Sequence, residues 1–416
     1  MLKNHHIRNI VLIWAAWAVI IIGYQTLVDA RMEIGRPDQS LEWTPNETGR
    51  NSLKDRLYLN EPFMNRQVAW DSEYYLSIAV VGYHDDQVPQ MTRRSGNGLP
   101  LSLNYAFFPV YPFLMNALSV PLSVLGMNAI ATATLAGVII SLVGTLFGMI
   151  ALYDLTRDEL EDAGGVRTAF YLLIFPSSFF LAQVYTEGLF VAFAFGSLAM
   201  LRHRRLLLAG ILAALATWTR SIGIALVIPL GLVWLEGIWK AYRTESGGIN
   251  AAFLKSYLLP TLALALPFAA YLIWRQAVGA NFDMVEDQWF GRTLFDWERF
   301  TAGMQFAWEG ITDGGNLQRR AYFLIEFASA ILGLTACIFT LRRHPGIALF
   351  SLVALLVAFT SGAPQGWVRF VVVAPALYIF LSRLGRNVAF DRAWTLASVL
   401  VMSLLTLLYT YDMWVA

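Results

Sequence analysis

Residues 128–153 read NAIATATLAGVIISLVGTLFGMIALY, a run of 26 residues without a charged side chain. About 20 helical residues cross a hydrocarbon core about 30 Å thick, so this run is long enough to span a membrane. The whole 416-residue chain has the same character, with 57% hydrophobic residues, 14% charged residues and a mean hydropathy of +0.53. Soluble domains contain about 25% charged residues. The sequence therefore predicts an integral membrane protein.

Ten further runs reach or approach the length of a span. They cover residues 9–28, 168–185, 187–202, 206–220, 222–239, 255–276, 320–341, 345–361, 369–383 and 393–412. The first follows Lys3 and Arg8 and could pass for a secretory signal, but no convincing cleavage site comes after it. We expect an all-α integral membrane protein of about 11 transmembrane helices, with residues 1–416 forming a single domain.

The placement of basic residues predicts the orientation of these helices, because Lys and Arg collect in cytoplasmic loops. With a cytoplasmic N-terminus and one crossing per run, all the basic clusters fall on the same side. These clusters are Arg157/Arg167, Arg202/Arg204/Arg205, Lys240/Arg243, Arg342/Arg343 and Arg383/Arg386. A further span at 107–125 would invert every later loop. We therefore predict that FFPVYPFLMNALSV, residues 107–120, is a helix lying on or dipping into the outer face.

Two large loops then share the outer side, at residues 29–127, with interfacial helices, and at 277–318. The cytoplasmic loops are short, so the chemistry is expected to face outward. The formal net charge is +1, which provides no overall field to attract nucleic acid. The single cysteine, Cys337, lies in an apolar run and is predicted to pack in the core.

Charged residues near hydrocarbon are costly and so suggest function or a structural partner. Asp71 and Glu73 open WDSEYYLSIAVVGY, residues 70–83, whose pattern predicts a helix along the membrane interface. Asp71 either caps this helix or acts as a catalyst, and the residues alone leave both open. Glu187 in VYTEGLF is expected either to pair with Arg220, which we slightly favour, or to bind a sugar hydroxyl.

Arg220 and Arg369 lie at the same outer level, where a guanidinium group suits a phosphate. One of them could instead be an interfacial anchor. His84, Asp85 and Asp86 are adjacent and are interpreted as a solvated turn, not as a metal site. The sequence has no Gly-rich phosphate loop before a helix, no GxSxG and no HExxH. Nucleotide hydrolysis, acyl transfer and zinc proteolysis therefore have no support.

An outward carboxylate, two arginines and nearby aromatic residues together indicate a lipid-phosphate substrate. In glycosyl transfer from a lipid phosphate the leaving group is already an anion, so one carboxylate is enough to accept the proton of the attacking hydroxyl. The main alternative is a transporter or flippase of a lipid-linked or anionic substrate, because arginines near broken helices also suit translocation. A scaffold for a partner enzyme is a third interpretation.

Five segments, in this order, resemble the PIG-V type of mannosyltransferase within the GT-C superfamily of multi-span glycosyltransferases. They are WDSEYYLSIAVVGY, FFPVYP, FPSSFFLAQVYTEGLF, TRSIG and GWVRF. The resemblance implies that Asp71 is the catalytic base, with Trp70 beside it. It also implies site roles for Phe108, Pro109, Tyr111 and Pro112 in the floor motif, Tyr185 and Glu187 in the acidic motif, and Arg220 in the Thr-Arg-Ser motif.

The resemblance further implies a mannose donated by a polyprenyl or dolichyl phosphate, a glycolipid or glycan acceptor, inversion at the anomeric carbon, and no metal or other cofactor. The expected substrate-binding residues are Trp70, Glu73, Tyr111, Tyr185, Glu187, Arg220 and Arg369. The family has a basic residue before the tryptophan, where this chain has Ala69, and Arg66 is the candidate substitute. The sequence shows no long disordered tail or retention signal, so we expect a bacterial plasma membrane, with the endoplasmic reticulum membrane as the alternative.

Overall fold

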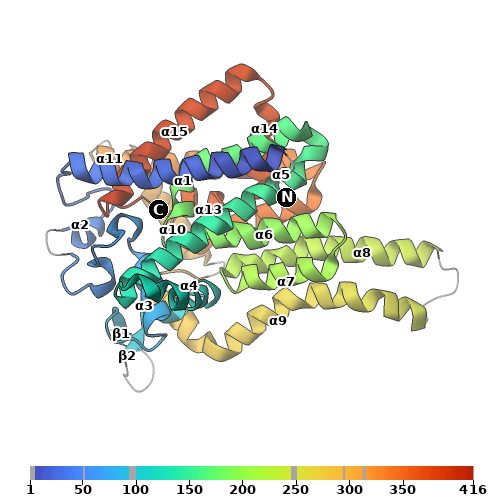
Figure 1. Ribbon diagram of the computed structural model, residues 1–416, viewed down its shortest axis with the longest axis horizontal. Coiled ribbons are helices and arrows are strands. Elements are labelled where there is room, and N and C mark those ends of the chain that lie inside the picture. Colours follow the sequence, from blue (N-terminus) through green and yellow to red (C-terminus); the bar gives the residue numbers. More distant parts are fainter. Residues whose placement is uncertain are drawn as a thin grey trace.

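The computed structural model describes residues 5–49, 52–92, 100–244, 251–293, 296–312 and 315–415, so Lys3 lies outside the described residues. The side chains of 241–244 and 251–256, including Arg243, also lie outside them. The chain is mainly helical (Figure 1). The α-helices are α1 (His5–Arg31), α2 (Thr44–Glu47), α3 (Asp71–Val80), α4 (Val110–Leu122), α5 (Ala129–Ile174), α6 (Glu187–Arg202), α7 (Leu206–Thr217), α8 (Val227–Thr244), α9 (Ala251–Gln288), α10 (Trp297–Thr312), α11 (Leu317–Leu341), α12 (Pro345–Thr360), α13 (Trp367–Val371), α14 (Pro375–Leu384) and α15 (Val388–Thr410).

Short 3₁₀ turns and one strand pair complete the described structure. The 3₁₀ turns are Leu57–Leu59, Asn65–Gln67, Leu103–Ala106, Ser123–Leu125, Ser178–Ala182 and Ser221–Leu226. Strands β1 (Gln90–Thr92) and β2 (Pro100–Ser102) are antiparallel, with Met91 opposite Leu101.

Six helices in the described chain are long and apolar enough to cross a membrane. They are His5–Arg31, Ala129–Ile174, Ser221–Lys240, Tyr257–Gln288, Leu317–Leu341 and Val388–Thr410. Four apolar helices are shorter, namely Val110–Leu125, Leu206–Thr217, Pro345–Thr360 and Pro375–Leu384. The prediction of a helical, multi-pass membrane protein is confirmed, whereas the count of eleven spans is not.

Prolines and local bends explain where the expected spans differ from the helices. The expected span 128–153 lies almost entirely within the 46-residue helix α5, which changes direction at Glu161 (φ 61°, ψ 175°). Only the first part of the expected span 168–185 belongs to this helix, and the rest includes the 3₁₀ turn Ser178–Ala182. Helix α5 ends at Ile174 because Phe175 precedes Pro176 and adopts an extended conformation. Similarly, Pro375 separates α13 from α14 inside the expected span 369–383.

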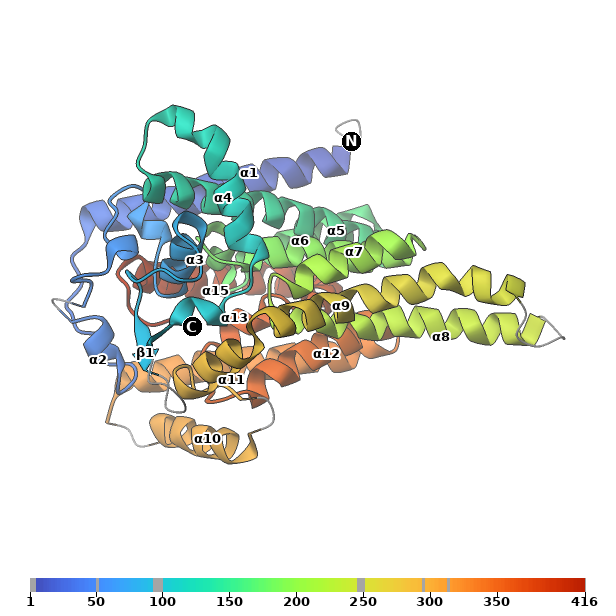
Figure 2. The ribbon, with the colours of Figure 1, turned by 90° about the horizontal axis from the view of Figure 1, so that it is seen from below.

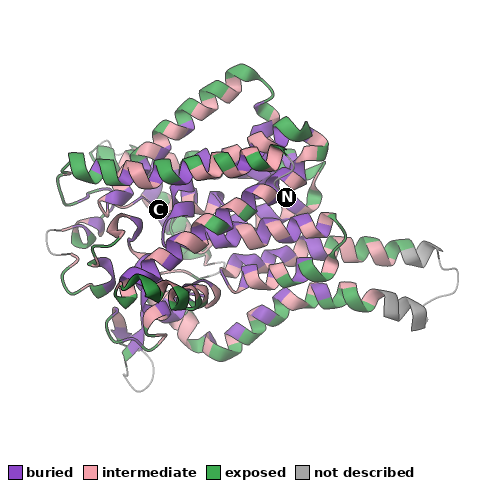
Figure 3. Ribbon diagram, in the orientation of Figure 1, coloured by how far each residue is buried: buried purple, intermediate pink, exposed green. Residues whose placement is uncertain are grey.

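Apolar side chains on the outside of the bundle mark the surface that faces lipid. Along α15, Leu396, Leu400 and Leu404 are 65%, 62% and 49% exposed. They recur every fourth residue and therefore share one face of the helix. Figure 3 shows this alternation of exposed and buried positions on α15, with buried residues concentrated between the helices.

Ion pairs gather the basic clusters at one end of the bundle. Glu159, beside the bend of α5, binds Arg343, His344 and Arg383 at 2.6, 2.7 and 2.8 Å. Asp154 on the same segment binds His203 at 2.7 Å. Loops that are distant in the sequence, and that were predicted to lie on one side of the membrane, therefore meet at the same end.

The opposite end, at the left of Figure 1, contains α2, α3 and the strand pair. Figure 2 shows α3 and α4 beside one another there, with the C-terminus close by. The predicted helix in 107–120 is present as α4, and the predicted interfacial helix in 70–83 as α3. Much of the second expected loop, 277–318, is helical, because α9 extends to Gln288 and α10 follows.

Close packing of α5 against α6 fixes the start of α6. A Cβ atom on Gly144 would lie 2.5 Å from the backbone oxygen of Gly188, and a Cβ atom on Gly188 would lie closer still to the oxygen of Ser141. Small residues at such crossings allow two helix backbones to approach closely.

We expect Gly188→Ala to lower the thermal unfolding midpoint of the purified protein, because the added methyl group must push the two helices apart. Overpacking of this kind costs about 1–3 kcal/mol. The matched control is Gly196→Ala on the same helix, where the nearest atom to an added Cβ is 3.5 Å away. Equal midpoints for the two variants would show that the crossing is not tightly constrained.

Candidate active site

A cavity of about 630 Å³ opens at the end of the bundle that contains α3. Its polar lining includes residues of α3 (Asp71 and Glu73), of the chain before Ser221–Leu226 (Arg220), of the turn after α9 (Arg292) and of α13 (Arg369). Aromatic side chains, among them Trp70 and Trp414, complete the wall. Segments far apart in the sequence thus bring charged and aromatic groups to one chamber.

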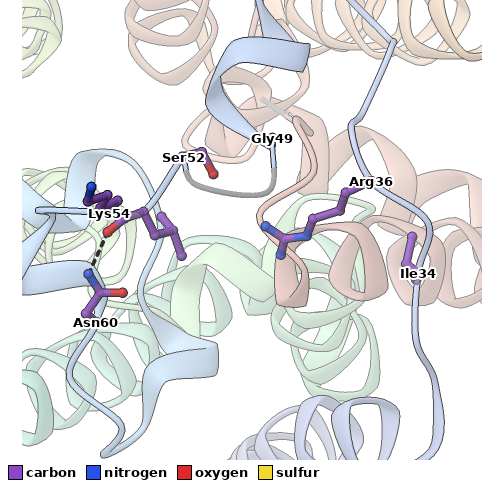
Figure 4. Close-up of a pocket in the computed structure, with 7 residues that line it drawn as sticks. Ile34, Arg36, Gly49, Ser52, Lys54 and Asn60 are labelled. Carbon is purple, nitrogen blue, oxygen red and sulfur yellow. Dashed lines mark hydrogen bonds between the residues drawn. The ribbon is translucent and has the colours of Figure 1, made fainter.

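A second cavity, of about 790 Å³, lies between surface loops outside the first (Figure 4). Its lining includes Arg36 and Lys54, and Asn60 Nδ2 donates to the Leu53 oxygen at 2.6 Å across its edge. Leu53 also lines the first cavity, so the two are neighbours. We place the candidate site in the smaller cavity because that chamber holds the candidate carboxylates and arginines.

Asp71 is the first residue of α3, and its carboxylate lines the cavity. Its side chain is 24% exposed, and Oδ2 lies 2.8 Å from Arg369 Nη1. The residue before it, Trp70, has a φ of +43°, a backbone conformation that residues with a Cβ atom rarely adopt. No side-chain cap hydrogen bond is found at this helix start. The structure therefore does not support the capping interpretation of Asp71.

The strained backbone around Trp70 is held by the segment before α6. Tyr185 Oη donates to the Ala69 oxygen at 2.9 Å, and Ser72 Oγ donates to the Val184 oxygen at 3.0 Å. Strain of this size persists only where surrounding contacts enforce it, and it is frequent at functional sites. These contacts fix the direction in which Asp71 points.

Glu187, at the start of α6, is fully buried and binds both arginines. Its Oε1 accepts from Arg220 Nη1, and from Arg369 Nε at 2.5 Å. Arg220 Nη1 also donates to Thr186 Oγ1 at 3.1 Å. The favoured pairing of Glu187 with Arg220 is therefore present, and Arg369 joins it. Arg369 connects this buried carboxylate to Asp71 in the cavity.

Tyrosine and tryptophan rings surround these charges. The Arg369 guanidinium lies 4.7 Å from the centre of the Tyr185 ring. Trp70 packs edge-on against Tyr409 and Trp414, at 5.5 and 5.2 Å between ring centres. The contact between the Arg369 cation and the face of the Tyr185 ring is attractive and holds the guanidinium in place.

Glu73 forms a second, more buried acidic site. It is 1% exposed, and Oε2 lies 2.7 Å from Arg56 Nη1. Its Oε1 has no hydrogen-bond partner among the described residues. Burial raises the pKa of Glu73 from its ordinary value of 4.5 to about 7, although the charge of Arg56 opposes this shift.

The expected site residues do not all reach the cavity. Trp70, Asp71, Glu73, Arg220 and Arg369 line it, as does Phe108. Tyr185 and Glu187 are fully buried directly behind them.

Other expected positions lie elsewhere. Tyr111 is buried in the core, where its Oη donates to the Gly137 oxygen at 3.0 Å. Arg66, the candidate substitute for a basic residue at position 69, pairs with Asp29 at 2.7 Å and is absent from the cavity lining. Asp85 accepts hydrogen bonds from Tyr58 and Ser77, and is a buried structural acid, not part of a solvated turn.

Glu326 is a residue that the sequence analysis missed. It lies fully buried in α11, and its carboxylate accepts from the backbone nitrogens of Gly366 and Val368 at 2.9 and 2.7 Å. These contacts hold the start of α13 and thereby position Arg369. Glu326 could have been singled out from the sequence, because an acid inside the apolar run 320–341 is costly unless it has partners.

Arg56, Glu286 and Arg292 also line the cavity and were not singled out in the sequence. They come from stretches of mixed charge, which look like solvated loops. In the described ranges, no group of three His, Cys, Asp or Glu residues is arranged to hold a metal ion.

The fold and the site define a multi-pass helical membrane protein with a charged cavity at one end of its bundle. The chain belongs to the PIG-V mannosyltransferase family, whose sequence profile matches residues 30–282, more than half of the chain. It is 28% identical over 255 residues to GPI alpha-1,6-mannosyltransferase 2 of Cricetulus griseus. The match covers 59% of this chain and 47% of that protein, so the chain spans about half the length of the relative.

Solved structures show a more distant likeness. ArnT from Cupriavidus metallidurans, bound to undecaprenyl phosphate, is 13% identical, with a TM-score of 0.46 over 97% of this chain and 76% of that chain. The apo oligosaccharyltransferase of Archaeoglobus fulgidus is 12% identical, with a TM-score of 0.44 over 96% of this chain and 56% of that chain. At these scores neither protein informs the substrate of this one.

We expect Glu187→Gln to destabilise the protein strongly, because Arg220 and Arg369 would lose their shared buried carboxylate. Removing one partner of a buried ion pair costs about 3–5 kcal/mol. The measurement is the thermal unfolding midpoint, compared with that of Glu236→Gln, which removes the exposed partner of Lys240 and Arg204. If both variants unfold like the wild type, the Glu187 network does not support the fold.

Glu73 is expected to make stability depend on pH. Between pH 4.5 and about 7 the folded chain retains a proton on Glu73 that the unfolded chain has released. The contribution of this proton to the free energy of unfolding is therefore fully present below pH 4.5 and is lost as the pH rises through 7. Unfolding midpoints at pH 5, 6, 7 and 8 should show wild type losing stability relative to Glu73→Gln. The exposed control Glu298→Gln should show the same change of unfolding midpoint with pH as the wild type. If Glu73→Gln also changes with pH as the wild type does, the expectation is contradicted.

Proposed function

We propose that this chain is an inverting glycosyltransferase. It transfers mannose from a polyprenyl- or dolichyl-phosphate donor to a hydroxyl of a glycolipid or glycan. The observation that carries the proposal is the Asp71 carboxylate, which lines the cavity, is 24% exposed and is held 2.8 Å from Arg369. Family membership supports mannose as the sugar.

In this reaction the acceptor hydroxyl oxygen attacks the anomeric carbon while its proton passes to the Asp71 carboxylate. The bond from that carbon to the phosphate oxygen breaks, and the phosphate leaves with the electron pair. Attack from the face opposite the phosphate inverts the anomeric carbon. No acid is needed for departure, because a phosphate is already a stable anion. Arg369 orients Asp71 by binding its other oxygen.

The remaining cavity residues have roles that follow from their positions. Trp70 and Trp414 offer flat faces for sugar rings. Glu73 is buried and paired with Arg56, and we assign it to the support of the cavity wall. Glu187 and Tyr185 hold Arg369 from behind, and we assign them to the positioning of the site.

The same proposal places the cavity on the non-cytoplasmic face. The basic clusters around Glu159 lie at the other end of the bundle, and clustered Lys and Arg favour the cytoplasmic side. Residues 29–127 and 277–318 are then outer segments of one transmembrane domain. The outer leaflet of a bacterial plasma membrane and the luminal leaflet of the endoplasmic reticulum both meet this requirement.

The test replaces Asp71 with Asn, which keeps the size of the side chain but removes its ability to accept the proton. We expect transfer of radiolabelled mannose from a polyprenyl phosphate to fall about 10²- to 10⁴-fold. Asp86→Asn, in an exposed loop, is the matched control and should transfer at the wild-type rate.

Wild-type transfer by an Asp71→Asn variant expressed at the normal level would remove Asp71 as the base. A wild-type protein that exchanges labelled lipid-linked sugar across proteoliposomes, and forms no new glycosidic product, would identify a transporter instead.

A further inference from the structure

Two arginine side chains meet the ring of Phe370 on α13. The guanidinium carbon of Arg220 lies 5.3 Å from the ring centre, and that of Arg292 lies 5.1 Å from it. Both side chains line the cavity, as do Phe370 and Arg369, the residue before it in the sequence. Two guanidinium groups therefore meet at a single aromatic ring, and the guanidinium of Arg369, which lies over the Tyr185 ring, belongs to the same cavity.

Two of these three cations are already neutralised. Arg220 binds Glu187, and Arg369 binds both Glu187 and Asp71. Arg220 and Arg369 thus share two carboxylates, those of Glu187 and Asp71, so this group has one carboxylate for each guanidinium. A phosphate that joined it would meet no surplus of positive charge. The buried carboxylate of Glu187 could not move away to make room, because it is fully enclosed.

Arg292 differs from the other two. In the part of the chain that the structure describes, its guanidinium has no carboxylate within 4 Å and no hydrogen-bond partner. Burial lowers the pKa of Arg292. The charges of Glu286 and Asp71 oppose this shift, and the charges of Arg369 and Arg220 add to it. An arginine is still protonated under such conditions. Arg292 thus presents to the cavity a positive charge that no carboxylate of the described residues binds directly, although the charges of Glu286 and Asp71 act on it from farther away.

The backbone holds Arg292 at this place. After α9 ends, the Arg292 nitrogen donates to the Glu286 oxygen at 2.8 Å, and Gly291 between them adopts φ of +63°. The Thr293 nitrogen donates to the Ser361 oxygen at 2.9 Å, which ties the turn to the segment before α13. The turn is therefore fixed at the same wall that carries Phe370.

We propose that Arg292 binds the phosphate of the lipid-linked donor, and this inference rests on the proposed function. Arg220 and Arg369 then serve mainly to hold Glu187 and Asp71, and Arg292 supplies the charge that the anion needs. A guanidinium can grip two phosphate oxygens at once. Arg292 lies outside residues 30–282, so the family match does not assign it a role.

The test measures binding of polyprenyl phosphate to the purified full-length protein in nanodiscs. Arg292→Gln should weaken binding about 10- to 100-fold, because a charge-assisted contact is lost, and Arg292→Lys should weaken it less. Uncharged polyprenol should bind Arg292→Gln and wild type equally. The matched control is Arg204→Gln, which removes an exposed arginine paired with Glu236, away from the cavity lining, and should bind like the wild type.

Each outcome decides between the two proposals. If wild type transfers mannose and Arg292→Gln binds polyprenyl phosphate as tightly as wild type, the role of Arg292 is refuted and the proposed function stands. If wild type transfers no sugar from any polyprenyl phosphate, the proposed function itself fails. Asp71→Asn separates the steps further, because it should keep phosphate binding while losing transfer. A loss of polyprenol binding in both Arg292 variants would indicate general damage to the cavity and also refute a specific phosphate contact.

Discussion

The cavity depends on one buried carboxylate. Glu187 is fully enclosed, and its Oε1 binds both Arg220 and Arg369. These residues come from the start of α6, from the chain before α8 and from α13, and Arg369 then binds Asp71 on α3. A buried ion is costly by itself, so the geometry persists only while all partners are present. Segments separated by up to 298 positions, from Asp71 to Arg369, are thereby joined.

Exposure separates Asp71 from three buried acids that hold the structure around the cavity. The side chains of Glu187 and Glu73 are 0% and 2% exposed, and each is occupied by arginine. Glu326 is likewise buried, against the backbone of α13. The Asp71 side chain is 24% exposed while also bound by arginine. The Asp71 carboxylate is therefore both oriented and accessible, as a general base must be.

The cost of burying charge made part of this site predictable from sequence. Glu187, Arg220 and Arg369 were recognisable because each interrupts an apolar stretch at the same level. Glu326 obeys the same rule and could have been found with it. Arg292 could not, because it follows the end of a helix in a stretch of mixed charge, and only the fold turns it into the cavity. Tyr111 was expected in the site because the family resemblance implies it, whereas its side chain packs in the core and donates to the Gly137 oxygen. Helix ends were similarly uncertain where prolines such as Pro176 and Pro375 divide apolar runs.

The arrangement around Phe370 has an electrostatic consequence for any anion that enters. Arg220 and Arg292 each lie near its ring, so an apolar group takes space that water would otherwise fill between like charges. Weaker screening increases their mutual repulsion as well as their attraction for an anion. Contact of each cation with the ring offsets part of that repulsion. Binding a phosphate relieves the rest without moving either backbone segment, because the Thr293–Ser361 bond and the Glu326 contacts already fix both. If the proposed function holds, the cavity therefore already has its charges in the arrangement that an anion requires, and binding needs no rearrangement of the protein.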